Sequence, residues 1–310
     1  MRTQSLSLIS QADGLTLSAL LALPQGNPRG LVQIAHGMAE YKERYTPFLE
    51  FLTGEGYACL INDHRGHGAS AASPQDLGWF GPAGARGLVE DLRQLTLGFQ
   101  ERFPGLPLCL FGHSMGSLAV RAYARRYGIP QALVVCGCPG QNSMADAGLA
   151  LVKALTLLRG ERFHSKLVNR LINGPLSKPF AQEGSPFAWL NSDPQAVRAY
   201  EEDPLCGFLF TLNGYKALLT LMKEAYASDG WVPSAAAKVL FISGAEDPCM
   251  VSRAQLDQAA ACMVRAGYPQ VEVKVYPGMR HEILLEPGHL QVFQDVAAFL
   301  TAMAQAPSQD

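Results

Sequence analysis

The sequence predicts an α/β protein with a mostly parallel, doubly wound sheet and a helical cap inserted into it. Through residues 1–140, short apolar runs alternate with helix-like segments, as expected of β-α-β units. Across residues 141–233 the alternation stops, and the apolar residues fall at helical spacing. It resumes over residues 234–310. We therefore expect one core in two segments, 1–140 and 234–310, with the cap at 141–233.

The first core segment begins with a predicted hairpin. Two strands, Leu6–Ser10 and Leu15–Leu23, flank Asp13-Gly14, a dipeptide typical of tight turns. Buried strands and amphipathic helices then follow in alternation. In chain order they are a strand at Gly30–Ala35, a helix at Tyr45–Glu55, a strand at Ala58–Asn62, a helix at Leu88–Arg102, a strand at Pro107–Phe111, a helix at Met115–Tyr127 and a strand at Leu133–Gly137.

The predicted cap contains no run with the character of a buried strand. Its expected helices are Ala147–Leu158, Lys166–Ile172, Gln195–Glu201 and Phe208–Tyr226. The core resumes with a strand at Lys238–Ser243, a helix at Ser252–Ala266, a strand at Val271–Tyr276 and a helix at Val292–Ala304. The tail, Ala306–Asp310, is expected to fray. A helical block at this place is expected to cover the carboxyl ends of the strands, where open α/β sheets bind ligands.

Composition excludes several classes of protein. The chain has 310 residues and a formal net charge of -2, with no cluster of Lys or Arg, so we expect no nucleic-acid partner. No stretch approaches the ~18 apolar residues of a membrane span, and the N-terminus lacks the apolar run of a signal peptide. We expect a cytoplasmic protein, with peripheral membrane contact left open. The 7 cysteines include no CxxC pair, and we expect them to be reduced.

The strongest signal for chemistry is the run Gly112-His113-Ser114-Met115-Gly116. It lies between a predicted strand and a predicted helix, as a nucleophile elbow requires. Ser114 would occupy a strained conformation on a sharp turn. Gly112 and Gly116 would leave room for the backbone that the turn brings close. The sequence therefore predicts Ser114 as a nucleophile; the alternative is a glycine-rich turn with an incidental serine.

A nucleophilic serine needs a base and an acid that orients the base. In elbow enzymes the acid and then the histidine follow the serine along the chain. Asp247 and His281 each follow a predicted strand, so both are expected at the carboxyl edge of the sheet. Glu246 adjoins Asp247 and stays an alternative acid. The other histidines fit less well: His36, His64, His67 and His113 precede the acid, His164 lies in the insertion, and His289 is expected to help start the last helix.

Two backbone N–H groups are expected to form an oxyanion hole. One belongs to Met115, the residue after the nucleophile. The other belongs to Met38 in the turn His36-Gly37-Met38, where Gly37 permits a close approach. The alternative is an ordinary turn between strand and helix. This chemistry needs no metal and no organic cofactor, and we expect none.

Together these motifs resemble the monoacylglycerol lipase and lysophospholipase branch of the α/β-hydrolases, also grouped with serine aminopeptidase-like hydrolases. The resemblance extends over both core segments and one stretch of the cap. It rests on His36–Glu40 with Arg44-Tyr45, Asp63–Ser70, Gly112–Ser117, the loops of Asp247 and His281, and Asp203–Phe208. It implies hydrolysis of monoacylglycerols, lysophospholipids or related esters through an acyl-enzyme. It also implies that Asp63–Ser70 supports the site without a catalytic role.

The predicted cap is rich in apolar side chains that suit three roles. They could line an acyl-chain tunnel, contact a membrane surface, or pack the cap on the core. The first cluster is Leu149, Leu151, Val152, Leu155, Leu157 and Leu158; the second is Phe208, Leu209, Phe210, Leu212, Leu218, Leu219, Leu221 and Met222.

Other reactions stay open for the same triad: those of an aminopeptidase, a thioesterase or a C–C bond hydrolase. A peptidase that takes free amino termini would need carboxylates near the serine. The insertion offers Glu183, Glu201, Glu202, Asp203 and Glu224. A binding protein without enzymatic activity is the remaining alternative, because this fold also serves such roles.

Overall fold

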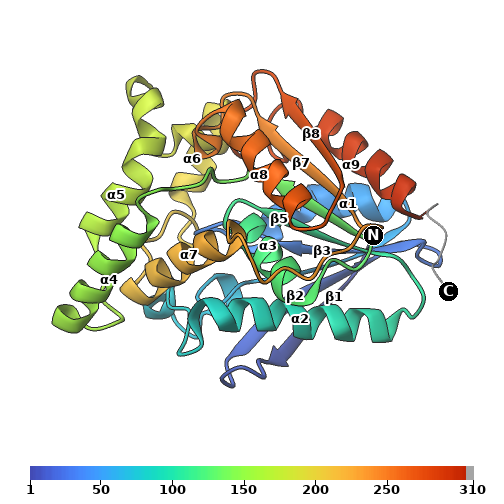
Figure 1. The fold of residues 1–310 in the computed structure, drawn as a ribbon, viewed down its shortest axis with the longest axis horizontal. Coiled ribbons are helices and arrows are strands. Elements are labelled where there is room, and N and C mark those ends of the chain that lie inside the picture. The colour runs from blue at the N-terminus through green and yellow to red at the C-terminus, as the bar shows by residue number, and fades with distance from the viewer. Residues whose placement is uncertain (305–310) are drawn as a thin grey trace.

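The computed structural model describes residues 1–304, and it confirms the predicted fold class. An eight-stranded sheet has the order β1-β2-β4-β3-β5-β6-β7-β8. Strands β3 to β8 pair in parallel, whereas β2 pairs antiparallel with both β1 and β4. Helices lie on both faces of the sheet (Figure 1). The predicted fraying of Ala306–Asp310 concerns residues outside those described.

The elements alternate as predicted in the two core segments. The strands are β1 Arg2–Ile9, β2 Thr16–Leu23, β3 Gly30–Ala35, β4 Tyr57–Asn62, β5 Leu108–His113, β6 Ala132–Cys136, β7 Lys238–Gly244 and β8 Gln270–Tyr276. The helices are α1 Thr46–Gly54, α2 Gly84–Arg102, α3 Met115–Tyr127, α4 Ala145–Arg159, α5 Lys166–Ser177, α6 Pro194–Glu202, α7 Leu212–Ala225, α8 Arg253–Arg265 and α9 His289–Ala304.

The core consists of two apolar layers, one on each face of the sheet. Successive side chains of a strand point to opposite faces. In β5, Leu108 and Leu110 therefore join the layer formed with α2, α3 and α8, whereas Cys109 and Phe111 join the layer formed with α1 and α9. Because both faces are covered, the central strands are buried along their whole length and mostly apolar. The predicted site residues lie at the carboxyl ends of these packed parallel strands.

Several predicted boundaries were wrong by a few residues. β1 begins at Arg2 and not at Leu6, because it is an edge strand whose backbone pairs with β2 while its side chains stay exposed. α7 begins at Leu212 and not at Phe208. There the Thr211 side chain accepts the Gly214 N–H and caps the helix. Helices α2 and α9 each begin one turn before the predicted apolar residue.

Helices α4 to α7 lie between β6 and β7, where the sequence predicts the cap. The boundaries at 141 and 233 stay predictions. α4 and α5 lie at one end of the molecule, away from the strands (Figure 1). Leu157 and Leu158 of α4 are 89% and 79% exposed, so these two residues line no tunnel in this structure. Among residues 1–304, no helix is both long and apolar enough to cross a bilayer.

Candidate active site

The three predicted catalytic residues follow strands that end at the same sheet edge. In the parallel register, His113 of β5 pairs with Cys136 of β6, and Cys136 pairs with Ile242 of β7. Ile242 pairs in turn with Lys274 of β8. Ser114 follows β5, Asp247 lies in the loop after β7, and His281 lies in the loop after β8. The sheet therefore brings together residues that are far apart in the chain.

Ser114 has the strained backbone predicted for a nucleophile elbow. Its φ is 53° and its ψ is -118°, a conformation that non-glycine residues rarely adopt. A Cβ on Gly116 would lie 2.0 Å from the carbonyl oxygen of Ala35, and a Cβ on Gly112 would lie 2.4 Å from that of Gly116. Both glycines are thus required by the turn, which positions Ser114 at the N-terminus of α3.

Asp247 and His281 form a buried hydrogen-bonded pair. His281 Nδ1 lies 2.9 Å from Asp247 Oδ2, and the side chains are 2% and 0% exposed. Asp247 also accepts hydrogen bonds from the Cys249 N–H at 2.8 Å and from Ser243 Oγ at 3.2 Å. Donation from Nδ1–H to the carboxylate leaves the lone pair of His281 Nε2 free to accept a proton. The alternative acid, Glu246, is exposed to solvent.

Within residues 1–304 the Ser114 hydroxyl makes no hydrogen bond to the His281 ring, whose hydrogen-bond partner is Asp247. His113 precedes Ser114, and its ring centroid lies 4.8 Å from that of His281. The predicted oxyanion turn lies close to the serine, because a Cβ on Gly37 would lie 3.2 Å from Ser114 Cβ. Ser114 is 9% exposed and His281 is 1% exposed, so the site is covered in this conformation.

In the turn after β3, the N–H groups on either side of Met38 have acceptors. The Gly37 N–H donates to Glu40 Oε1 at 2.5 Å, and the Ala39 N–H donates to His67 Nε2 at 3.2 Å. Within residues 1–304, the N–H groups of Met38 and Met115 donate to no protein atom. Met115 is the first residue of α3, where the N–H groups have no partner within the helix. Both N–H groups are available to bind a negatively charged oxygen.

The segment Asp63–Ser70 forms a buried polar support under this turn. Asp63 accepts hydrogen bonds from the Lys42 N–H at 2.9 Å and from Lys42 Nζ at 2.6 Å. The guanidinium of Arg65 is fully buried and pairs with Asp13 at 2.7 Å and Asp91 at 2.6 Å. These contacts tie the segment to neighbouring parts of the core; that it supports the site without a catalytic role stays a prediction.

Other candidate residues lie away from the site. His164 is exposed and contacts the Leu209 carbonyl oxygen, and His289 begins α9 as predicted. Most of the carboxylates considered for a peptidase are paired with other side chains. Four of them bind other partners: Glu183 binds Arg280, Glu224 binds Arg126, Glu201 binds Ser185, and Asp203 binds Tyr41.

One group within residues 1–304 has the proximity that a metal site needs. The ligand atoms of Asp247, Cys249 and His281 lie within 4.8 Å of one another. Two of these residues already share the 2.9 Å hydrogen bond described above. The group is therefore explained by its internal hydrogen bonds. All 7 cysteines are free thiols, and five of them are buried.

Trp189 is a candidate that sequence reasoning missed. Its ring centroid lies 5.0 Å from that of His281, so a residue of the insertion covers the imidazole. It belongs to a short 3₁₀ turn, Ala188–Leu190, which has too few residues to show a helical period. Its type, a large aromatic residue in an insertion, was the sole available signal.

Comparisons with known proteins identify the family of the chain. The family model described as serine aminopeptidase, S33, matches residues 26–288. A monoacylglycerol lipase of Mycolicibacterium smegmatis is 28% identical over 90% of each chain. A human monoglyceride lipase is 29% identical over 63% of this chain and 62% of its own.

Solved structures show the same fold. The carboxyl esterase of Bacillus coagulans, in complex with glycerol, is 27% identical, with a TM-score of 0.89 over 98% of this chain and 99% of that chain. A monoglyceride lipase variant of Saccharomyces cerevisiae has a TM-score of 0.74 at 18% identity, over 97% and 94% of the two chains. The elbow, the buried pair and the family match agree: the chain has the α/β-hydrolase fold and belongs to the serine aminopeptidase S33 family.

Proposed function

We propose that this chain hydrolyses monoacylglycerols or lysophospholipids, with Ser114 as nucleophile, His281 as base and Asp247 as the orienting acid. The chain is a carboxylic ester hydrolase, as its sequence predicts and as its relatives among monoacylglycerol lipases and carboxyl esterases indicate. The observation that carries the residue assignment is the buried 2.9 Å Asp247–His281 hydrogen bond. It lies at the sheet edge that also holds the strained Ser114.

In the proposed acylation step, Ser114 Oγ attacks the carbonyl carbon of the ester, and His281 Nε2 takes the hydroxyl proton. The carbonyl oxygen becomes an oxyanion, which accepts hydrogen bonds from the N–H groups of Met38 and Met115. His281 then gives the proton to the departing alcohol. An acyl group remains on Ser114.

In the proposed deacylation step, a water molecule attacks the acyl carbon and His281 Nε2 takes its proton. The second oxyanion collapses, the proton returns to Ser114 Oγ, and the carboxylic acid leaves. In both steps Asp247 holds the imidazole by its Nδ1–H and stabilises the positive charge that develops on it. In each step His281 therefore acts first as a base and then as an acid.

We extend the proposal to the insertion, which we assign as a cap. The Trp189 ring lies against His281, so a substrate reaches the serine after this segment moves. The exposed leucines of α4 and α5 give the insertion an apolar surface; they are Leu157, Leu158, Leu167 and Leu171. A surface of this kind suits transient contact with the membrane or micelle that carries the lipid.

Replacement of the nucleophile tests the assignment. Ser114→Ala is expected to lower kcat for a p-nitrophenyl ester by a factor on the order of 10⁴–10⁶. Ser143→Ala, in an exposed position of the insertion, is the matched control and should keep the wild-type rate. Turnover of Ser114→Ala at the wild-type rate, in a preparation free of other esterases, would refute the proposal.

The substrate class needs a separate experiment. A chain-length series of monoacylglycerols and lysophospholipids, measured beside an aminoacyl anilide, distinguishes an esterase from an aminopeptidase. We expect the esters to be preferred, because the carboxylates Glu183, Glu201, Asp203 and Glu224 bind partners other than an amino terminus. Preference for the anilide would contradict the proposed substrate class.

A further inference from the structure

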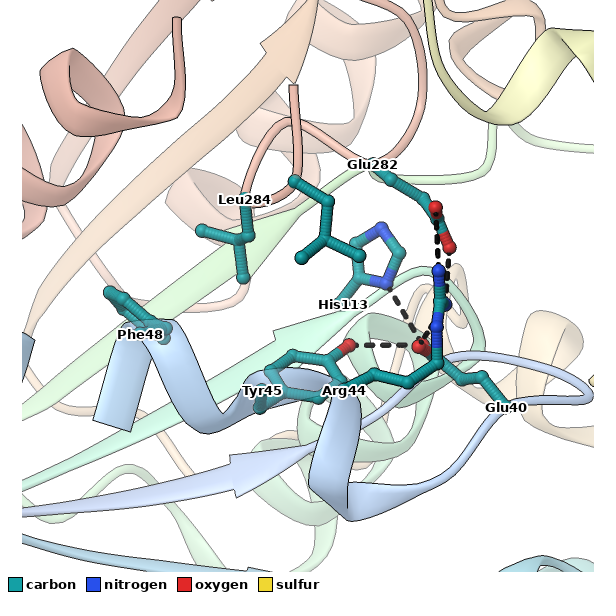
Figure 2. A pocket seen from close by; sticks show the side chains of 8 residues that line it. Glu40, Arg44, Tyr45, Phe48, His113, Glu282 and Leu284 are labelled. Atoms are coloured by element: carbon teal, nitrogen blue, oxygen red, sulfur yellow. Dashed lines mark hydrogen bonds and ion pairs between the residues drawn. The ribbon is translucent and has the colours of Figure 1, made fainter. Parts of the chain in front are cut away.

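A buried ion cluster formed by Glu40, Arg44 and Glu282 lies beside His113 and takes no part in the steps above (Figure 2). Arg44 lies between two carboxylates. Its Nη1 is 2.8 Å from Glu40 Oε2 and 2.5 Å from Glu282 Oε1, and its Nη2 is 2.9 Å from Glu282 Oε2. The three side chains are 12%, 4% and 5% exposed for Arg44, Glu40 and Glu282. The cavity beside them holds about 10 Å³, which is too small for a substrate.

The second oxygen of Glu40 holds the proposed oxyanion turn. Glu40 Oε1 accepts hydrogen bonds from the Gly37 N–H at 2.5 Å and from the Tyr45 hydroxyl at 3.0 Å, and it lies 3.3 Å from His113 Nδ1. Burial raises the pKa of Glu40, but the hydrogen bond with His113 and the charge of Arg44 outweigh it and hold the pKa well below its usual range. Glu40 is thus a buried anion that accepts a hydrogen bond from the Gly37 N–H of the proposed oxyanion turn and pairs with Arg44.

The other end of the cluster holds the histidine loop. Glu282 follows His281 in the chain, and its own N–H donates to the Leu190 carbonyl oxygen at 2.8 Å. Its carboxylate accepts hydrogen bonds from both terminal nitrogens of Arg44, Nη1 and Nη2. A bidentate guanidinium–carboxylate pair fixes orientation as well as distance. Arg44 therefore connects Glu40, in the turn that carries Met38, with Glu282, the neighbour of the proposed base His281.

His113 adds a second connection between the same two loops. Its Nδ1 faces Glu40 Oε1, and its Nε2 lies 3.3 Å from the His281 carbonyl oxygen. Both neighbours are acceptors, so both ring nitrogens must carry a proton to satisfy them. Burial lowers the pKa of His113, but the hydrogen bond and charge of Glu40 outweigh it and raise the pKa. The positive charges of the resulting imidazolium and of the Arg44 guanidinium together balance the negative charges of the two carboxylates.

We propose that Glu40 is a positioning residue that couples the oxyanion turn to the histidine loop through Arg44, Glu282 and His113. The inference rests on the proposed function, because it concerns the alignment of Met38 with His281. Both groups must act on the same carbonyl, and displacement of either by 1 Å lowers the rate steeply. An apolar cluster of similar volume would avoid the desolvation of four charges. Charged groups are used here, in our proposal, because their directional hydrogen bonds hold the oxyanion turn and the histidine loop in register.

The test replaces the charge of Glu40 and keeps its shape. Glu40→Gln is expected to lower kcat for a soluble p-nitrophenyl ester by a factor on the order of 10–100, with KM within about threefold of wild type. Binding of a trifluoromethyl ketone, whose adduct carries an oxyanion, should weaken in proportion to kcat/KM. Glu50→Gln, which changes an exposed carboxylate of α1, should leave all three quantities unchanged.

Glu282→Gln provides the second arm and covers the case in which Glu40→Gln fails to fold. It should lower kcat by a smaller factor than Glu40→Gln does, again with little change in KM. The double variant should lose less than the product of the two single effects, because both break one connection. Wild-type kcat in folded Glu40→Gln, or in Glu282→Gln, would overturn the inference, as would a loss confined to KM. A fully active Ser114→Ala would instead overturn the proposed function itself, so the two failures are distinguishable.

Discussion

The sheet edge and the insertion contribute to the same site in different ways. At the edge, Asp247, His281 and Glu40 each have buried partners at hydrogen-bond distance. In the insertion, α4 exposes Leu157 and Leu158 almost completely, while a short turn carries Trp189 against His281. The edge is built for fixed geometry, because the proposed chemistry requires atoms at set distances. The insertion presents surface and cover, which tolerate variation in position.

The largest expected effect concerns two neighbouring carboxylates at the edge. Asp247→Asn should lower kcat by a factor on the order of 10⁴, because an amide cannot hold the same imidazole tautomer. Glu246→Gln should keep near wild-type activity, since Glu246 is exposed and Asp247 is the partner of His281. Steady-state rates with a p-nitrophenyl ester measure both. An inactive Glu246→Gln beside an active Asp247→Asn would reverse the assignment.

The edge should also make the protein sensitive to acid. The rings of His36, His64 and His67 stack under the oxyanion turn, with centroids of His36 and His64 4.1 Å apart. Burial, followed by the charge of a neighbouring histidine, lowers the pKa of His36 and of His67 to about 3 and that of His64 well below its usual value. Such groups favour the folded state above the unfolded pKa of about 6.5 and lose this contribution as the pH falls.

The measurement is the free energy of unfolding by urea between pH 7.5 and pH 5. It should fall below about pH 6.5 by ~1.4 kcal/mol per pH unit for each extra proton that the unfolded chain binds. The raised pKa of His113 adds no slope below pH 6.5, because its contribution is already complete there; that contribution is lost only as the pH rises above 6.5 through the folded pKa. A free energy that stays flat from pH 6.5 to pH 5 would contradict the buried, neutral histidines.

The smallest effect concerns the surface of the insertion. The double variant Leu157→Gln/Leu158→Gln should hydrolyse monoacylglycerol in phospholipid vesicles about 3–10-fold more slowly, because less apolar surface enters the interface. Its rate with a soluble short-chain ester should stay at the wild-type value. Leu97→Gln is the matched control, since Leu97 is an exposed leucine on α2. An equal loss with both substrates would mean that the two leucines act on the site rather than on lipid contact.

The sequence predicted the parts of the molecule that local rules determine. The order of strands and helices follows from apolar periodicity, and the fold class is confirmed by the sheet and by the solved relatives. Ser114 was identifiable because its turn requires glycine at fixed positions. Asp247 and His281 were identifiable from chain order and from the strands that precede them. Their catalytic roles stay predictions.

Other features depend on tertiary contacts that no local pattern shows. Arg2–Ser5 join β1 through backbone pairing with β2, which needs no apolar side chains. Helix α7 begins at the Thr211 cap, although the apolar run continues before it. Glu40 was visible as part of a motif, but its partner Glu282 is 242 residues away by number and reaches it through Arg44. Trp189 contacts His281 only because the insertion folds over the edge.

The central claim is that Ser114, His281 and the Met38 and Met115 N–H groups act together on one ester: Ser114 attacks the carbonyl carbon, His281 moves the proton, and the two N–H groups bind the oxygen. A crystal structure of the fluorophosphonate adduct, with mass spectrometry of the labelled peptide, tests it most directly. The account predicts phosphorus on Ser114 Oγ, with the phosphonyl oxygen about 2.7–3.1 Å from both N–H nitrogens. A label on another residue, or a phosphonyl oxygen that faces solvent away from Met38 and Met115, would contradict the account.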